Sequence, residues 1–427
     1  MKTFVSDFRA GAYAFALTAL WAGSALAGEE VKEWKRHTID ASDKSAGKLG
    51  ADGVRLGFAN ADDNPDVVTG WENGDAIRVA LNPGPENAKA LWPAFTVGRV
   101  QGAEDAVFAD LDADGVLDVV SCTEGKTRTV FVHWAPESVD DYEKGEAWTT
   151  EAIPGLEGAR MWMYCLPFDA NGDGREDLIL GAKNKGATVG WLEQPAENPR
   201  DLANWSYHEL YEAGWIMSIR ANDLDGDGDE DVVFSDRKGA STGVWWLENV
   251  GKGAGRGGSV FGEPKLLGAS GDEVMFLDIA DVNRDGRRDV VAAVRERDVV
   301  VLLQPGDPAS PWTERRGSFP AKTVAFSSGT AKAVGWFPGN SENSPWRFLL
   351  TCERANGNAH GVFVLEPETG SEFGDGSPLS MRPVSGPVGV KFDRMELLDL
   401  DGDGDLDLMT CEERDNLGVF WYENPGN

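Results

Sequence analysis

The sequence is poor in the residues that carry much of metal and enzyme chemistry. Its 427 residues include only four histidines and four cysteines, and no two cysteines stand in a C-x-x-C arrangement. A zinc site built from cysteine and histidine is therefore not expected. No G-x-S-x-G, phosphate-binding or dinucleotide-binding motif stands between a predicted strand and a predicted helix, so the sequence carries no signature of those enzyme classes.

Basic residues are also scarce, since 40 Lys and Arg stand against 72 Asp and Glu, for a formal net charge of −32. Such an acidic surface repels nucleic acids and anionic lipids, and we expect neither as a partner. The even number of cysteines leaves three disulfide pairings open, and buried unpaired thiols are an equally acceptable interpretation. The residues concerned are Cys122, Cys165, Cys352 and Cys411.

Long apolar runs are absent beyond the N-terminal region. There, Lys2 and Arg9 precede a short apolar run, and small residues follow as far as Ala27. This order predicts a secretory signal peptide over residues 1–27, cleaved near Ala27. We therefore expect a protein that is secreted, periplasmic or on the cell surface, with a mature chain over 28–427 that does not insert into a membrane.

One acidic motif is abundant. The pattern D-x-[DN]-x-D-G-x-x-D, followed by an apolar run such as DVVF, occurs at 110–118, 169–177, 223–231, 281–289 and 399–407. A shortened copy lies at 60–68, and a copy at 335–350 has Phe348 in place of the last Asp. The seven last positions are 66, 118, 177, 231, 289, 348 and 407, with intervals of 52 to 59 residues. Such a period indicates stacked supersecondary units.

Each repeat predicts four short strands. One precedes the acid loop, one follows it, a third ends in a Pro, Asn or Gly break, and a more polar fourth completes the unit. Four strands at this period are typical of a β-propeller, here all-β and seven-bladed. Residues 34–40 look like a fourth strand without a third, and 418–423 look like a third without a fourth. We therefore expect the N-terminal strand to complete the last blade, which removes a free sheet edge.

The acid loops predict calcium sites. Oxygens at positions 1, 3, 5 and 9 alternate around a tight turn, as at the start of an EF-hand loop, and Gly at position 6 allows that turn. Carboxylates this close repel one another without a cation. We predict about five structural calcium ions, with a metal-free solvated turn as the alternative. The predicted ligands are Asp110, Asp112, Asp114, Asp118, Asp169, Asn171, Asp173, Asp177, Asp223, Asp225, Asp227, Asp231, Asp281, Asn283, Asp285, Asp289, Asp399, Asp401, Asp403 and Asp407.

These loops, in this strand context, resemble the FG-GAP/VCBS repeats of integrin α-chain propellers and of bacterial secreted proteins. The resemblance covers residues 33–427 and departs from the pattern in the first and sixth copies. It implies a calcium-stabilised propeller and, commonly, extracellular binding. Some bacterial proteins of this architecture are carbohydrate-active lyases or dehydratases. The resemblance does not fix a ligand, because function depends on the site and not on the fold.

Basic residues gather on the turns between second and third strands, opposite the acid loops. Propellers bind ligands over the central funnel, so we predict an anion-binding funnel suited to sulfated or uronic-acid polysaccharide. Together with polar residues of the innermost strands, the predicted ligand-binding residues are Arg160, Tyr164, Lys183, Arg220, Arg237, Arg295, Arg354, Arg394 and Arg414. The alternative is that the turn residues are solvated and paired with nearby acids such as Glu124.

We predict a monomeric binding module for an acidic polysaccharide or an extracellular protein. Two other interpretations stay open. On the inner strands, the third and fifth positions before the first Asp of each intact loop can line the channel, and they include Asp105, Tyr164, Arg220, Asp278, Arg394 and Glu396. A Tyr–Arg–carboxylate set among them could remove a proton beside a uronate carboxylate, as in a β-eliminating lyase. A purely structural cell-surface module is the third interpretation. A tight cluster of Tyr, Arg and carboxylate in the funnel would favour the enzyme, and an acidic, flat face would favour the structural module.

Overall fold

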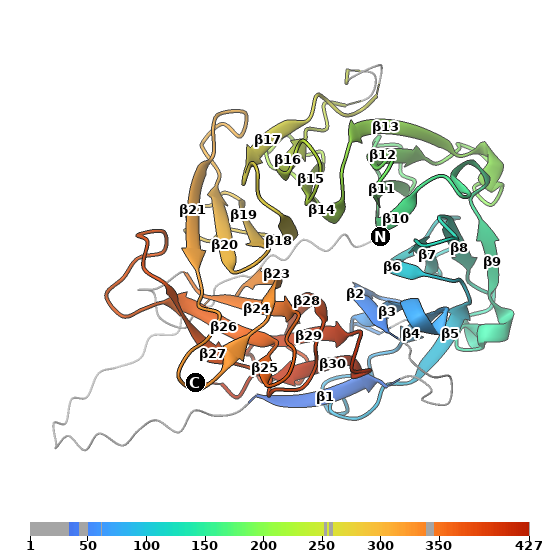
Figure 1. The fold of residues 1–427 in the computed structure, drawn as a ribbon. Coiled ribbons are helices and arrows are strands. Elements are labelled where there is room, and N and C mark those ends of the chain that lie inside the picture. The colour runs from blue at the N-terminus through green and yellow to red at the C-terminus, as the bar shows by residue number, and fades with distance from the viewer. Residues whose placement is uncertain are drawn as a thin grey trace, which may run out of the picture. The chain divides into compact units, whose positions relative to one another are not determined.

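The computed structural model describes residues 34–41, 50–60, 62–251, 254–255, 259–338 and 346–426. Within these ranges the chain forms seven four-stranded sheets, arranged as blades in a ring around a central axis (Figure 1). The innermost strand of each blade contacts that of the next blade, and the seventh contacts the first. The prediction of an all-β, seven-bladed propeller is confirmed, whereas the predicted signal peptide lies outside the described residues.

The first four blades follow the chain in simple order. Blade 1 consists of β2 (Ala51–Gly57), β3 (Asp66–Trp71), β4 (Ala76–Ala80) and β5 (Ala94–Gly98). Blade 2 consists of β6 (Ala103–Ala109), β7 (Asp118–Thr123), β8 (Val130–Trp134) and β9 (Thr149–Ala152). Blade 3 consists of β10 (Met161–Phe168), β11 (Asp177–Lys183), β12 (Thr188–Glu193) and β13 (Ser206–Glu212). Blade 4 consists of β14 (Ile216–Asn222), β15 (Asp231–Asp236), β16 (Gly243–Leu247) and β17 (Lys265–Gly268).

The last three blades complete the ring. Blade 5 consists of β18 (Val274–Ala280), β19 (Asp289–Val294), β20 (Asp298–Leu303) and β21 (Thr313–Ser318). Blade 6 consists of β23 (Thr330–Trp336), β24 (Phe348–Glu353), β26 (Val362–Pro367) and β27 (Leu379–Pro383). Blade 7 consists of β28 (Phe392–Leu398), β29 (Asp407–Glu412), β30 (Gly418–Glu423) and β1 (Lys35–Asp40).

Short elements connect some of the blade strands. A parallel two-stranded pair that the sequence did not predict joins β22 (Ser327–Ser328) to β25 (Ala359–His360). The 3-10 turns are η2 (Glu72–Gly74), η3 (Val139–Asp141), η4 (Gly145–Ala147), η5 (Pro154–Leu156) and η6 (Leu202–Asn204). No helix within the described ranges has the length and apolar character needed to cross a membrane.

The N-terminal strand closes the ring, as the sequence predicted. Strand β1 runs antiparallel to β30, with Lys35 opposite Glu423 and Thr38 opposite Phe420. The last blade is therefore built from both ends of the described chain, and in Figure 1 the blue β1 lies beside the red β30. This pairing leaves β30 no free edge along its length.

The second strand of every blade begins at the residue that the repeat spacing identified. These strands start at Asp66, Asp118, Asp177, Asp231, Asp289, Phe348 and Asp407. Apart from the last residue of β24, every residue of these seven strands is buried. Because neighbouring blades cover both of its faces, the sequence of such a strand is a continuous apolar run and does not alternate between apolar and polar residues. The core therefore lies between the blades.

Each innermost strand also has a shift in register near its start. In β6 the shift falls between Ala103 and Asp105, in β10 between Trp162 and Tyr164, and the other five blades have an equivalent one. A bulge bends the strand and re-aims the side chains that follow it. These shifts lie at the end of each strand that faces the funnel described below.

Candidate functional site: acid loops and a charged funnel

The five intact acid loops hold carboxylates close together. In three of them, side-chain oxygens lie within 4.8 Å of one another; the groups are Asp110, Asp112 and Asp114; Asp223, Asp225 and Asp227; and Asp399, Asp401 and Asp407. The other two intact loops have Asn171 or Asn283 at the third position. Carboxylate and amide oxygens at this density are a donor set that suits calcium.

The first Asp of each loop also holds the turn in shape. The Asp110 carboxylate accepts hydrogen bonds from the amides of Asp114 (3.1 Å) and Gly115 (3.2 Å). Asp223 accepts the amide of Gly228 at 3.1 Å in the same way. Some loop carboxylates have a protein cation as a neighbour, since Arg200 Nε lies 2.6 Å from Asp112 Oδ2. The side-chain oxygens are therefore gathered by the fold before any ion binds.

The last Asp of each loop has a second role that the sequence did not predict. Asp118 Oδ1 accepts the amide of Ala135 at 2.7 Å, and its Oδ2 accepts the amide of Leu111 at 3.3 Å. The carboxylate therefore ties the loop to the end of the third strand. Asp66, in the shortened first loop, makes the equivalent bond to the amide of Asn82 at 2.8 Å. Because the bond persists where the acid pattern is lost, it serves the blade itself.

Burial of these last carboxylates changes their acidity. Desolvation raises the pKa of Asp118, Asp231 and Asp407 to about 7, and that of Asp66 and Asp177 to about 6. A cation beside such a carboxylate favours its ionised form. In blade 6, Phe348 replaces the acid and packs against the ring of Phe373 at 5.4 Å between centroids.

Amide side chains at the end of third strands join neighbouring blades. Gln194 Nε2 donates to the carbonyl of Leu111 at 2.9 Å, Asn249 Nδ2 to that of Ala170 at 2.9 Å, and Gln304 Nε2 to that of Leu224 at 2.6 Å. Each bond reaches the acid loop of the preceding blade. These amide residues lie 17, 18 and 15 residues after the last Asp of their loops, whereas Ala135 takes the equivalent place in blade 2. This recurrence was the signal that the sequence offered.

The predicted funnel exists as a cavity of about 370 Å³ on the axis of the ring. Seven of the nine predicted ligand-binding residues line it, namely Tyr164, Lys183, Arg237, Arg295, Arg354, Arg394 and Arg414. The other two do not. Arg160 forms an ion pair with Glu209 and donates to the carbonyl of Gly186, and Arg220 lies 4.0 Å from Glu396.

The funnel is not uniformly basic, in contrast to the prediction. It is lined by eight carboxylate residues as well as eight Lys or Arg, and the two kinds are partly segregated around the ring, with blades 6 and 7 contributing both. Blades 4 to 6 contribute Arg237, Arg295, Lys332 and Arg354, which we name the cationic arc. Blades 1, 2 and 7 contribute Asp52, Glu72, Glu104, Glu124 and Glu413, which we name the anionic arc.

Residues of the cationic arc come from equivalent places and are incompletely paired. Arg237, Arg295 and Arg354 each follow directly on the second strand of a blade or lie within one residue of its end. Arg237 and Arg295 share Glu273, at 3.5 and 2.7 Å, and Glu353, which also lines the funnel, lies 3.3 Å from Arg295. The Nε groups of both arginines are buried without a hydrogen-bond acceptor among the described residues. Burial, followed by the charge of Arg295, lowers the pKa of Arg237.

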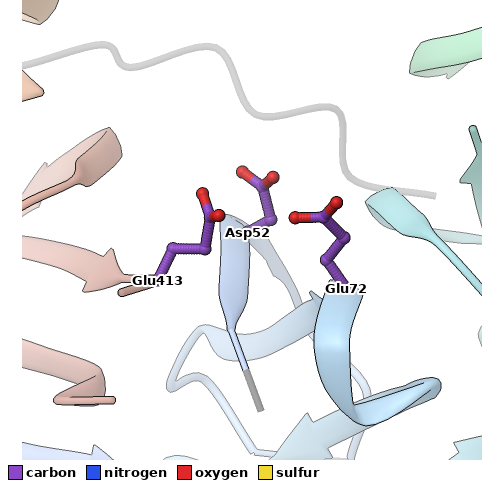
Figure 2. Close-up of side chains that lie close together, drawn as sticks. All are labelled: Asp52, Glu72 and Glu413. Atoms are coloured by element: carbon purple, nitrogen blue, oxygen red, sulfur yellow. The ribbon is translucent and has the colours of Figure 1, made fainter. Parts of the chain in front are cut away.

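The anionic arc gathers carboxylates around Glu72. Oxygens of Asp52, Glu72 and Glu413 lie within 4.8 Å of one another, and Figure 2 shows the three side chains turned toward one another. Lys391 lies beside two of them, forming an ion pair with Glu413 and lying 3.6 Å from Asp52. Burial raises the pKa of Asp52.

Blade 2 continues the anionic arc. Glu104 and Glu124 both pair with Lys183, at 3.1 Å in the case of Glu104. Burial raises the pKa of Glu104 to about 7. The alternative prediction, that turn cations pair with acids such as Glu124, therefore holds for Lys183. It does not hold for Arg354, whose exposed side chain has no ion pair within the described ranges.

A tight Tyr–Arg–carboxylate cluster lies where the funnel meets the inner strands. Tyr164 Oη accepts hydrogen bonds from Arg55 Nη1 at 2.9 Å and from Arg394 Nη1 at 2.8 Å. Arg55 in turn donates to both oxygens of Asp105, at 3.2 and 3.1 Å, and Arg394 donates to Glu396 at 2.7 Å. All except Glu396 are buried.

Sequence reasoning found four of these five residues and missed Arg55. Tyr164, Arg394, Asp105 and Glu396 came from counting three or five positions back from the first residue of each intact loop. The same count from Asn60, at the start of the shortened first loop, reaches Arg55. The signal was therefore available, but we applied the count only where the acid pattern was intact.

The cysteines and tryptophans are mainly structural. All four cysteines are buried free thiols, which matches the alternative to disulfide formation. Trp162 and Trp246 are fully buried between strands. Trp215 differs, because it lines the funnel and has Arg237 and Lys238 at 4.8 and 4.3 Å from its ring centroid. Its indole N–H is buried without an acceptor among the described residues.

Comparisons with known proteins agree with the fold and the repeat. A family model described as an FG-GAP-like repeat matches residues 169–234 and 223–292, which include three of the acid loops. No curated protein matches the chain. Among solved structures, YCF48 from Cyanidioschyzon merolae has a TM-score of 0.52 at 10% identity, covering 93% of this chain and all of that chain. The Dos1 propeller has a TM-score of 0.51 at 11% identity, covering 89% of this chain and 79% of that chain.

At these identities the solved structures share the fold alone. The repeat match identifies two stretches of the chain as FG-GAP-like repeats, and these stretches lie in blades 3 to 5 of the seven-bladed ring. The chain is a seven-bladed β-propeller with FG-GAP-like repeats, in keeping with an FG-GAP β-propeller family.

Proposed function

We propose that this protein is an exported, calcium-stabilised binding propeller whose funnel takes up an acidic polysaccharide. The incompletely paired cationic arc carries the proposal. Arg237 pairs only with Glu273 among the described residues, and Arg295 pairs with Glu273 and Glu353. The buried Nε groups of both arginines have no hydrogen-bond acceptor in the described ranges, and the exposed Arg354 has no ion pair there. Guanidinium groups bind carboxylate and sulfate oxygens through charge-assisted hydrogen bonds. An anionic group of the ligand would supply the missing acceptors.

The anionic arc fits the other chemistry of a sugar. Glycan hydroxyl groups are hydrogen-bond donors, and the Glu72 carboxylate has no ion pair among the described residues. A uronate or sulfate at the cationic arc and hydroxyls at the anionic arc would satisfy both sides of the cavity. A neutral glycan would not supply an anionic acceptor for the arginines, and a highly charged polyanion without hydroxyls would be repelled by the carboxylates.

The binding proposal is tested by calorimetric titration of the calcium-loaded protein with sulfated, uronic and neutral polysaccharides. We expect saturating heats with the first two and none with the neutral set. Heats of equal size for neutral and acidic glycans would contradict the role of the cationic arc. Silence across the whole panel would argue against any glycan and favour an extracellular protein partner.

Calcium is proposed for the acid loops because their oxygens are gathered before an ion binds. An ion held by side chains from both sides of the turn would fix the first strand of the blade to the second. In blade 4 the ligands would include Asp223, Asp225 and Asp227, whose oxygens lie within 4.8 Å of one another. Removing this repulsion is what a bound cation contributes to stability.

One substitution and a control in the same loop test the calcium proposal. Asp227→Ala should remove one bound calcium ion per chain, and it should lower the melting temperature in calcium but not in chelator. The control is Asp229→Ala, an exposed acid of the same loop that does not stand at any of the predicted ligand positions 1, 3, 5 and 9. Metal analysis and thermal melts are the measurements. An unchanged metal count in Asp227→Ala would refute the proposal for this loop.

A further inference from the structure

Tyr164 stands out among the tyrosines because of its hydrogen bonds. Its hydroxyl oxygen accepts one bond from Arg55 Nη1 and one from Arg394 Nη1, and these two donors occupy both of its lone pairs. No described residue accepts the hydroxyl proton. The side chain is only 2% exposed, so bulk water does not surround it. A buried phenol with two cationic donors and no acceptor for its proton is arranged to hold the phenolate form.

The charges around Tyr164 favour the same form. Arg55 from blade 1, Arg394 from blade 7 and Arg220 from blade 4 face it, against Asp105 from blade 2 and Glu396 beside Arg394. Glu396 is shared, since Arg394 donates to it at 2.7 Å and Arg220 lies 4.0 Å away. Asp278, a buried carboxylate of blade 5, also interacts with Arg220. The two guanidinium groups that contact the hydroxyl oxygen directly, those of Arg55 and Arg394, favour a negative charge on it.

The direction of the pKa shift of each tyrosine agrees with this arrangement. Burial alone would raise the pKa of Tyr164, but the charges of Arg394, Arg55 and Arg220 outweigh it and lower the pKa. The other tyrosines of the described ranges shift the opposite way. Burial raises the pKa of Tyr207 to about 12, and it also raises the pKa of Tyr142, Tyr211 and Tyr422.

We propose that Tyr164 is a proton-accepting residue, whose oxygen removes a proton from the carbon next to the carboxylate of a uronic-acid glycan bound in the funnel. This inference rests on the proposed function for its ligand class. Tyr164 and the cationic arc line the same cavity. In the step, the proton moves from carbon to the phenolate oxygen, and the electron pair stays on the ligand as an enolate. The enolate oxygens are neutralised by guanidinium groups, and return of the proton restores the ligand.

The ionisation of Tyr164 can be tested without any ligand. We expect the near-ultraviolet absorbance of the intact protein to show one tyrosine ionising clearly below pH ~10, the ordinary tyrosine value. The early step should be lost in Tyr164→Phe and kept in Tyr207→Phe, which changes a half-buried tyrosine bonded to Thr188 outside the funnel. Absence of any step below pH ~10 in the unmodified protein overturns the proposal, and this outcome does not depend on whether a variant folds.

The proton transfer is tested by isotope exchange in heavy water. We expect a uronic-acid oligosaccharide to gain deuterium at the carbon beside its carboxylate, at least about 100-fold faster with the unmodified protein than with Tyr164→Phe. An early ionisation step without exchange would overturn the role as a proton acceptor. If calorimetric heats are seen without exchange, this inference fails while the binding function stands. If the ionisation step is seen without heats, the proposed binding function fails, and the uronate assignment fails with it.

Discussion

The two arcs of the funnel carry opposite charges and differ in how those charges are paired. In the anionic arc, Lys391 and Lys183 each pair with two carboxylates, and Glu72 forms no ion pair with a described residue, although the charge of Lys391 acts on it. In the cationic arc, Arg237 pairs with Glu273, Arg295 pairs with Glu273 and Glu353, and Arg354 has no ion pair among the described residues. The total charge of the lining is balanced, so its composition alone would predict a neutral channel. Segregation is what creates a field across the cavity.

This difference means that a ligand must be complementary to two surfaces of opposite charge. The unpaired groups of the cationic arc are hydrogen-bond donors, whereas those of the anionic arc are acceptors. A ligand with an anionic group on one side and hydroxyl donors on the other would be oriented by the cavity. Neutralising residues of the cationic arc should therefore lower the affinity for an acidic ligand, and neutralising residues of the anionic arc should raise it.

The largest effect is expected from the cationic arc. Arg295→Gln should lower the affinity for an acidic glycan about 10- to 100-fold, because a charge-assisted hydrogen bond contributes about 1.5–3 kcal/mol. Calorimetric titration measures the change. Arg160→Gln is the matched control, since Arg160 was also a predicted ligand residue but pairs with Glu209 outside the cavity. An equal loss in both variants would mean that the arc does not contact the ligand.

The anionic arc should respond in the opposite direction. Glu72→Gln removes a carboxylate that no described cation neutralises, and it keeps a group that can accept a hydrogen bond. We expect the affinity for an acidic glycan to rise about threefold, the size of a screened charge interaction. Glu157→Gln, at an exposed position after η5, serves as the control. If Glu72→Gln weakened binding instead, the carboxylate would be a direct partner of the glycan.

The smallest effect is a dependence on pH. Glu104, which faces Lys183 and Glu124, has a pKa raised to about 7 by burial, so it loses its charge as the pH falls through that value. The anionic arc then repels a sulfated glycan less, and sulfate itself stays ionised. Affinity should therefore rise about twofold between pH ~8 and pH ~6. Glu104→Gln should flatten the profile, and an unchanged profile in that variant would assign the dependence to another group.

Much of the fold could be predicted because it depends on local pattern. The start of every second strand was fixed by one residue of the repeat, even in blade 6, where Phe348 stands for the missing acid. Ring closure by β1 followed from an incomplete unit at each end of the repeat. An apolar run between two turn signals is enough to identify such a strand, because each blade contacts only its two neighbours and these bury both of its faces.

The candidate sites were less predictable, and the reason differs between them. The acid loops are contiguous, so their oxygens could be identified from spacing. The double role of Asp118 could not, because its partner amide at Ala135 comes from a strand whose register is set by the blade. The bulges near the start of the inner strands, such as that between Trp162 and Tyr164, depend likewise on strand pairing.

The sequence by itself determined the number of blades, the position of each acid loop and the residue types on each turn, because these follow from a period along one chain. Only the tertiary structure decided that cations and carboxylates share the funnel on separate arcs. It alone placed Arg55 and Arg394, which lie 109 and 230 residues from Tyr164, on one phenol oxygen. Contacts of that range exist only once the ring closes, since closure alone brings blades 1, 3 and 7 to a common axis.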